Sequence, residues 1–288
     1  MRYGVPYKGS KSRIASKIID LLPEANTFVD LFAGGCAVTH AAMLSGKYKR
    51  FIINDLDGRG TQLFCDSMLG KYSTSRCPEW ITREEFHARK DTDPYVALCW
   101  SFGNDMNSYL YGKNIEDWKH AYHAAVFCGD LSEWHAMGFD APVCEETDIT
   151  KRYEFYKAII RGTGKYPALE SLERLQRLQS LERLCGLQGL QNLESKNLER
   201  FRLDYKAVAI PDDAVIYCDI PYRSRWNKYG SGINYGEFYS WASDRKNVFV
   251  SEYEMPANFK EVSAWEVRQL APADTNTRKA VEKLWRAV

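Results

Sequence analysis

The stretch Thr27-Phe28-Val29-Asp30-Leu31-Phe32-Ala33-Gly34-Gly35-Cys36 decides the fold class. Its first six residues form a short, mostly apolar run that is typical of a buried strand, and a turn with two glycines follows. Residues 37–45 then predict a helix, and residues 50–53 predict a second strand that ends in Asn54-Asp55. A strand, a glycine turn, a helix and a strand in this order form one unit of a parallel α/β sheet.

Segments on both sides of this unit continue the same α/β style. Residues 12–22 place isoleucine and leucine at helical spacing, and Pro23 ends that helix. Far downstream, residues 214–218 and 247–251 are apolar runs that predict two further buried strands. Residues 279–288 predict a final helix or strand. The chain therefore reads as one α/β domain with a long insertion between its two halves.

Within the insertion, leucine recurs at every third position from Leu169 to Leu193. In a helix this spacing moves each leucine about 60° backwards around the axis, so a long stripe would wrap around the helix. In a strand the leucines would alternate between the two faces. Two interpretations stay open for residues 169–198: a solenoid of short coils, or a solvated, helix-prone spacer.

Composition excludes several classes of protein. The 288 residues include 39 Lys+Arg and 38 Asp+Glu, a formal charge of +1, so no bulk basicity indicates a nucleic-acid partner. No apolar run of about 18 residues predicts a membrane span, and no apolar leader follows Met1. The eight cysteines contain no Cys-x-x-Cys pair, which is unlike a zinc site or a disulfide framework. We expect a soluble cytoplasmic protein.

Two motifs near the N-terminus point to a nucleotide-like ligand. The turn at Gly34-Gly35 lets a ligand approach the backbone closely, and Asp55 at the next strand end can accept hydrogen bonds from two ribose hydroxyls. The loop Tyr7-Lys8-Gly9-Ser10-Lys11 places basic residues before a helix, where an anion can bind. A helix-capping Asp55 and a solvated loop are the alternatives.

A third motif, Asp219-Ile220-Pro221-Tyr222, directly follows the strand at residues 214–218. Open α/β sheets bind their ligands at the carboxyl ends of the strands. The carboxylate of Asp219 and the carbonyl of Ile220 can accept hydrogen bonds from one amino group, while Tyr222 can stack on a planar base. A turn with a capping Asp219 and a packed Tyr222 is the alternative.

Together, these motifs resemble those of the Dam-like DNA adenine methyltransferases, which use S-adenosylmethionine. Residues 7–11 are similar to the family's cofactor loop, residues 30–35 to its phenylalanine–glycine motif, and Asp55 to its ribose-binding strand end. Residues 219–222 are similar to its catalytic tetrapeptide, and the order of the motifs is that of the permuted class. The family usually has proline where Ile220 stands, but the role there belongs to the backbone carbonyl. Downstream, residues 202–205, 250–253 and 282–285 also look like segments of the family.

The resemblance implies a Rossmann-like methyltransferase sheet, formed by residues 1–70 and 199–288, with a mainly helical DNA target-recognition domain at residues 71–198. The implied reaction moves a methyl group from S-adenosylmethionine to the 6-amino group of an adenine flipped out of duplex DNA, without a metal. The implied catalytic residues are Asp219, Ile220, Pro221 and Tyr222. The implied cofactor-binding residues are Tyr7, Lys11, Asp30, Phe32, Ala33, Gly34, Gly35, Asp55, Asp204 and Tyr205.

We expect most DNA contacts from the insertion, because residues 151–206 hold 12 Lys+Arg and 7 Asp+Glu. The candidate DNA-binding residues are Lys8, Asn104, Asn107, Tyr109, Arg223, Arg225 and Lys228. We expect a monomer in a bacterial or phage-infected cell. Two other functions stay open: a methyltransferase acting on another planar amine, such as cytosine, RNA or a protein glutamine, and a catalytically silent DNA-binding relative.

Overall fold

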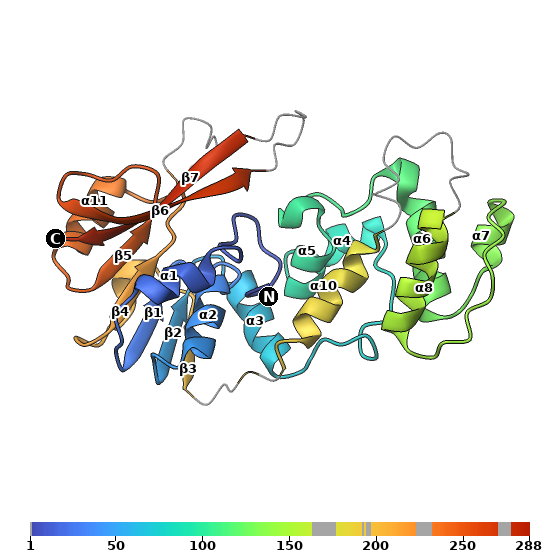
Figure 1. Ribbon diagram of the computed structural model, residues 1–288, viewed down its shortest axis with the longest axis horizontal. Coiled ribbons are helices and arrows are strands. Elements are labelled where there is room, and N and C mark those ends of the chain that lie inside the picture. The colour runs from blue at the N-terminus through green and yellow to red at the C-terminus, as the bar shows by residue number, and fades with distance from the viewer. Residues whose placement is uncertain (1, 163–176, 192, 194–196, 223–231, 270–277) are drawn as a thin grey trace. The chain divides into compact units, whose positions relative to one another are not determined.

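The computed structural model describes residues 2–162, 177–191, 193, 197–222, 232–269 and 278–288 (Figure 1). The chain divides into two compact units. The first consists of Met1–Gly4, Gly9–Thr61 and Glu194–Val288. The second consists of Val5–Lys8 and Gln62–Leu193, so the division falls inside helix α3 (Arg59–Met68).

The first unit contains a seven-stranded sheet with the order β3-β2-β1-β4-β5-β7-β6. Strands β3, β2, β1, β4 and β5 run parallel to one another, whereas β7 runs antiparallel to both β5 and β6. The strands are β1 (Thr27–Asp30), β2 (Arg50–Asn54), β3 (Leu198–Phe201), β4 (Val215–Cys218), β5 (Val248–Ser251), β6 (Phe259–Gln269) and β7 (Arg278–Ala287). This confirms the predicted α/β sheet, and the final segment is a strand.

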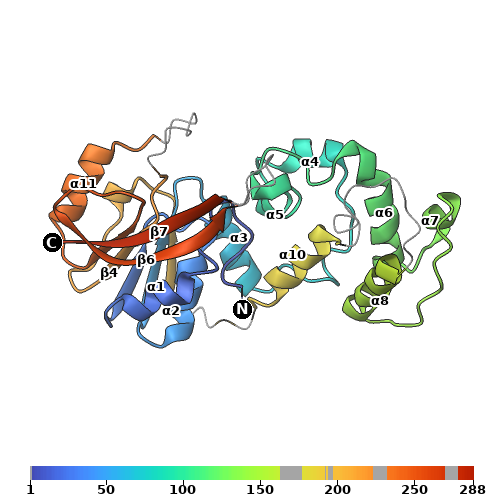
Figure 2. The same cartoon turned by 45° about the horizontal axis from the view of Figure 1, so that its top comes forward.

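Two hydrophobic clusters cover the two faces of the sheet, because successive strand residues point to opposite sides. Phe28 and Tyr217 face a cluster that includes residues of α1 (Ala15–Leu21) and α2 (Ala37–Ser45). Val29 and Ile216 face the other cluster, which includes Phe238 and Trp241 of α11 (Tyr235–Ser243). The centre of the sheet is therefore a buried layer between helices (Figure 1, Figure 2).

The described part of the second unit is helical, as expected for the insertion. Its α-helices after α3 are α4 (Arg83–Arg89), α5 (Pro94–Cys99), α6 (Lys113–Phe127), α7 (Ser132–Ala136), α8 (Ile149–Gly162) and α10 (Gln179–Gln188). Aromatic rings fill much of its core: Trp80 stacks on Tyr111 at 5.3 Å and meets Trp100 edge-on at 5.1 Å between ring centroids. Within the described residues, no helix is long and apolar enough to cross a membrane.

The leucine repeat is part of this core where the structure describes it. Leu181, Leu184 and Leu187 of α10 are buried, as are Leu178 before the helix and Leu190 after it. Three leucines at every third position drift by only about 120° in total, which still fits one apolar helix face. The solvated-spacer interpretation is therefore wrong for this stretch, while residues 169–176 lie outside the described residues.

Candidate active site

Three acidic residues mark the carboxyl ends of three neighbouring parallel strands. Asp30 ends β1, Asp55 follows β2 and Asp219 follows β4. Strand β1 lies between β2 and β4, so these carboxylates meet at one edge of the sheet. The sequence predicted all three as site residues, and the fold brings them together.

Asp219 forms a close ion pair with Lys11. The Lys11 ammonium lies 2.8 Å from Oδ1 and 2.9 Å from Oδ2 of Asp219, and its side chain is only 7% exposed. Burial raises the pKa of Asp219 above its usual value, and the positive charge of Lys11 opposes that shift. The resemblance placed Lys11 with the cofactor, and in this structure the shortest contacts of its ammonium are with Asp219.

Tyr222 is held by contacts on its hydroxyl and on its ring. Its hydroxyl donates a hydrogen bond to Oε2 of Glu282 on β7, and its ring centroid lies 4.5 Å from that of Tyr253. Burial and the nearby charges of Asp219 and Glu282 raise the pKa of Tyr222 far above its usual value, so it stays a phenol. Between the two ends of the tetrapeptide, Ile220 is buried and the Pro221 carbonyl accepts a hydrogen bond of 2.8 Å from the hydroxyl of Tyr235.

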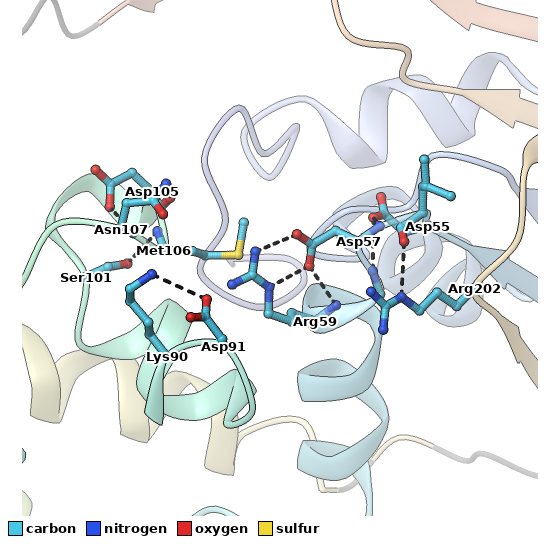
Figure 3. A network of polar contacts seen from close by, with 12 residues as sticks. Asp55, Asp57, Arg59, Lys90, Asp91, Ser101, Asp105, Met106, Asn107 and Arg202 are labelled. Atoms are coloured by element: carbon cyan, nitrogen blue, oxygen red, sulfur yellow. Dashed lines mark hydrogen bonds and ion pairs between the residues drawn. The ribbon is translucent and has the colours of Figure 1, made fainter. Parts of the chain in front are cut away.

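Asp55, directly after β2, is hydrogen-bonded to the backbone of the glycine turn. Its Oδ2 accepts a hydrogen bond of 2.9 Å from the Gly34 amide, and its Oδ1 accepts hydrogen bonds from the amides of Asp57 and Gly58. Figure 3 shows Asp55 beside Asp57 and Arg202. Burial raises the pKa of Asp55, and these amide donors oppose that shift. The residues of the turn after Phe32, namely Ala33, Gly34 and Gly35, are buried against this support.

Asp30 is the most isolated carboxylate of the three. Its Oδ2 accepts a hydrogen bond of 2.7 Å from the Thr39 hydroxyl, while Oδ1 is buried and has no hydrogen-bond partner among the described residues. Burial raises its pKa to about 7; the Thr39 hydrogen bond opposes this shift, and the charges of Asp219 and Asp55 add to it. Asp30 therefore titrates near neutral pH.

The segment around Asp204 and Tyr205 is tied to the same sheet edge. The side chain of Asn54 exchanges hydrogen bonds of 2.9 and 3.0 Å with the backbone of Leu203. Asp204 caps the short helix η2 (Tyr205–Ala207) by accepting a hydrogen bond from the Lys206 amide. The ring of Tyr205 lies 5.5 Å from that of Phe32. Two rings that the sequence predicted at a cofactor site therefore lie side by side.

Tyr7, Lys8 and the other candidate contacts of the insertion belong to the second unit. Tyr109 is buried and its hydroxyl donates to the Ile81 carbonyl, so it is a core residue of that unit. Asn104 donates to the Leu98 carbonyl, and Asn107 is exposed. The remaining DNA-binding candidates, Arg223, Arg225 and Lys228, lie outside the described residues.

Sequence reasoning about the site missed Glu282. Residues 282–285 looked like a family segment, but no role followed from that likeness. Only the pairing of β7 beside β5 brings Glu282 to Tyr222 and Lys11. Among the described residues, no group of three or more His, Cys, Asp or Glu side chains is arranged to hold a metal ion.

A mainly parallel α/β sheet, with a glycine turn after β1 and carboxylates at three adjacent strand ends, is typical of a protein that binds a nucleotide-like ligand at that edge. Residues 7–68 match the family model of the D12 class N6 adenine-specific DNA methyltransferases. Over these residues the chain is similar to that family, and the match supports an adenine-specific DNA methyltransferase. No curated protein matches the chain. The family implies S-adenosylmethionine as the methyl donor and DNA as the substrate.

Proposed function

We propose that Asp219, the Ile220 carbonyl, Pro221 and Tyr222 form the catalytic centre, and that the acceptor is the 6-amino group of adenine in duplex DNA. One observation carries the proposal: Asp219 follows a buried strand and lies at the same sheet edge as Asp30 and Asp55. That edge is where α/β sheets of this kind bind their ligands. The family match covers residues 7–68, so the roles of residues 219–222 rest on this geometry and on the sequence resemblance.

The residues at this edge fit S-adenosylmethionine. Asp55 would accept hydrogen bonds from the ribose hydroxyls at Oδ2, which keeps a lone pair beside its one backbone hydrogen bond, whereas Oδ1 already accepts from two amides. The buried Oδ1 of Asp30 would accept a hydrogen bond from the ammonium group of S-adenosylmethionine, while Phe32 and Tyr205 would flank the adenine ring of the cofactor. When bound, S-adenosylmethionine supplies the methyl group from its sulfonium centre.

Asp219 and the Ile220 carbonyl would act on the adenine amine. The lone pair of this amine is conjugated with the ring, so the amine is a weak nucleophile. Two acceptors at its hydrogens favour a pyramidal nitrogen and stabilise the positive charge that develops on it. The ammonium of Lys11, 2.8 Å from Asp219, favours the ionised form of that carboxylate and so opposes the effect of burial.

The acceptor nitrogen lies inside the DNA duplex, so the adenine must leave the base stack before it can react. Tyr222 would stack on the flipped base, and residues 71–198 would form the domain that recognises the target sequence. Exposed polar residues such as Asn107 would face DNA, and contacts between basic residues and phosphates would make the affinity depend on salt.

The test is transfer of a tritiated methyl group to mixed-sequence duplex DNA, followed by nucleoside analysis. We expect N6-methyladenine from the wild type. Asp219→Ala should lower the rate by about a hundred- to a thousandfold, the usual effect of losing one preorganised electrostatic interaction. Asp219→Asn, which leaves less empty space beside Lys11, should be similarly impaired.

Asp213→Ala is the matched control, because Asp213 is exposed and lies just before the same strand. It should keep the wild-type rate. Binding of S-adenosylmethionine, measured by calorimetry, should change little in the Asp219 variants, which would also show that they are folded. Methylcytosine as the product, or near-normal turnover by Asp219→Ala, would refute the proposal.

A further inference from the structure

Glu282 approaches the proposed catalytic centre from the antiparallel part of the sheet. On β7, Leu284 pairs with Ser251 at the end of β5, and the Glu252 amide donates to the Lys283 carbonyl. Glu282 therefore lies just beyond the carboxyl end of β5, at the same edge as the ligand-binding ends of the parallel strands. Glu282 is only 9% exposed to solvent.

The side chains of Tyr222 and Lys11 both contact this buried carboxylate. Oε2 of Glu282 accepts the hydrogen bond of the Tyr222 hydroxyl, and the Lys11 ammonium lies 3.9 Å from the same oxygen. Lys11 also lies 4.8 Å from the centroid of the Tyr222 ring. Asp219, Lys11, Glu282 and Tyr222 thus form one continuous network of alternating acceptor and donor groups.

This network links the aromatic ring to the carboxylate that would act on the amine. Tyr222 follows Asp219 by three residues, but a side chain at the end of a loop has several rotamers available. The hydrogen bond to Glu282 and the contact with Tyr253 together select one of them. Lys11 in turn is shared by two carboxylates, so Glu282 also influences the charge balance at Asp219.

We propose that Glu282 is a positioning residue for methyl transfer: it fixes the Tyr222 ring through the phenol hydroxyl and orients Lys11 between itself and Asp219. The inference rests on the proposed function of residues 219–222. It assigns to the C-terminal hairpin a direct part in arranging the catalytic centre.

The conservative variant separates the hydrogen bond from the charge. Glu282→Gln keeps an oxygen that can accept from the Tyr222 hydroxyl, whereas Glu282→Ala removes both acceptor and charge. We expect Glu282→Ala to lower kcat by roughly tenfold or more, as for loss of a hydrogen bond to a charged group. Glu282→Gln should recover most of that loss, and the KM for S-adenosylmethionine should change little in both variants.

The dependence of kcat on pH distinguishes this role from a purely structural one, because a substitution with only a structural effect would leave the pH dependence unchanged. The negative charge of Glu282 raises the pKa of Asp219, so its removal lowers that pKa. In Glu282→Gln the acid limb of the kcat profile should therefore move to lower pH. The matched control is Glu261→Gln, which removes a charge from an exposed ion pair with Lys283 in the same hairpin. It should leave the rate and the acid limb unchanged.

Tyr222→Phe tests the same hydrogen bond from its other end and leaves Glu282 in place. Tyr222→Phe should lower kcat. In the double variant with Glu282→Ala, the fold-loss in kcat should be smaller than the product of the fold-losses in the two single variants. Wild-type rates in both Glu282 variants, or equal losses in Glu282→Gln and Glu282→Ala, would overturn the inference. If Asp219→Ala is inactive but both Glu282 variants are fully active, the positioning role of Glu282 is refuted and the proposed function stands. If the wild type makes no N6-methyladenine, the proposed function is refuted as well.

Discussion

Asp55 has two tasks at the residue scale, because the groups that would bind a ribose also hold the glycine turn in place. Three backbone amides already donate to its carboxylate. We expect Asp55→Ala to weaken binding of S-adenosylmethionine by about tenfold or more, since hydrogen bonds to charged groups contribute roughly 1.5–3 kcal/mol each. Calorimetric titration of the cofactor measures the effect.

Asp57→Ala provides the comparison for this test, because it removes the ion pair with Arg59 (Figure 3) and keeps the amide of residue 57. The affinity of this variant for the cofactor should stay within about twofold of the wild type. Unchanged affinity in a folded Asp55→Ala protein would show that the ribose is held elsewhere.

The raised pKa of Asp30 should make the free energy of unfolding depend on pH. Its pKa is about 7 in the folded chain and near 3.8 when exposed, so the folded state holds a proton that the unfolded state releases. Stability attributable to this group is therefore present at low pH and is lost as pH rises through that range. Asp30→Asn keeps an acceptor for Thr39 and carries no charge, so it should remove this part of the decline between about pH 4 and 7.

Urea unfolding at several pH values measures the slope for wild type and for Asp30→Asn. Asp213→Asn, at an exposed position, should keep the wild-type slope. At pH 8 the Asp30→Asn protein should be at least as stable as the wild type. A steeper decline in Asp30→Asn than in the wild type would contradict the assignment of the buried proton to Asp30.

At the scale of elements, the N-terminal segment is fitted closely onto the glycine turn. Gly4 has a φ of +70°, and a Cβ there would lie 2.3 Å from the Gly35 carbonyl oxygen. Its amide donates to Nδ1 of His40, whose pKa is lowered to about 4 by burial, so that the ring stays neutral and can accept. Gly4→Ala should therefore displace the turn, lower the Tm and weaken cofactor binding.

Gly46→Ala is the control for this change. Gly46 has a φ of +72° and nothing within 4 Å of its Cβ position, so it shares the backbone cost of roughly 1–2 kcal/mol but not the clash. Thermal melts and cofactor titrations should show a clearly larger effect for Gly4→Ala. Equal shifts in Tm would mean that the close approach of Gly4 to the turn is unimportant.

The elements that sequence predicted best are those whose local pattern agrees with their place in the sheet. The strands β1, β2, β4 and β5 and helix α2 are continuous apolar or periodic runs, and the structure confirms them within one or two residues. Strand β3 escaped prediction because its centre, Glu199-Arg200, is exposed at the sheet edge. Pairing with β2 and the ion pair between Arg50 and Glu199 hold it there.

At the scale of the whole molecule, the sequence predicted those parts of the site that follow recognisable strands. Asp30, Asp55 and Asp219 each directly end or follow an apolar run, so their meeting at one edge followed from the parallel sheet. Glu282 and Tyr253 could not be placed in this way. Their positions depend on the pairing of β5 with β7, which no local pattern encodes.

The pairing of β1 with β4 has a consequence for the synthesis of the chain. Asp30 pairs with Tyr217, about 190 residues later, so at the usual speed of translation β1 waits on the order of ten to forty seconds for its central partner. During that time α1 and α2 can cover only the face of β1 that carries Phe28, while the face that carries Val29 still lacks α11. We therefore expect nascent chains that end before β4 to be prone to aggregation, because they expose apolar surface that the finished sheet buries.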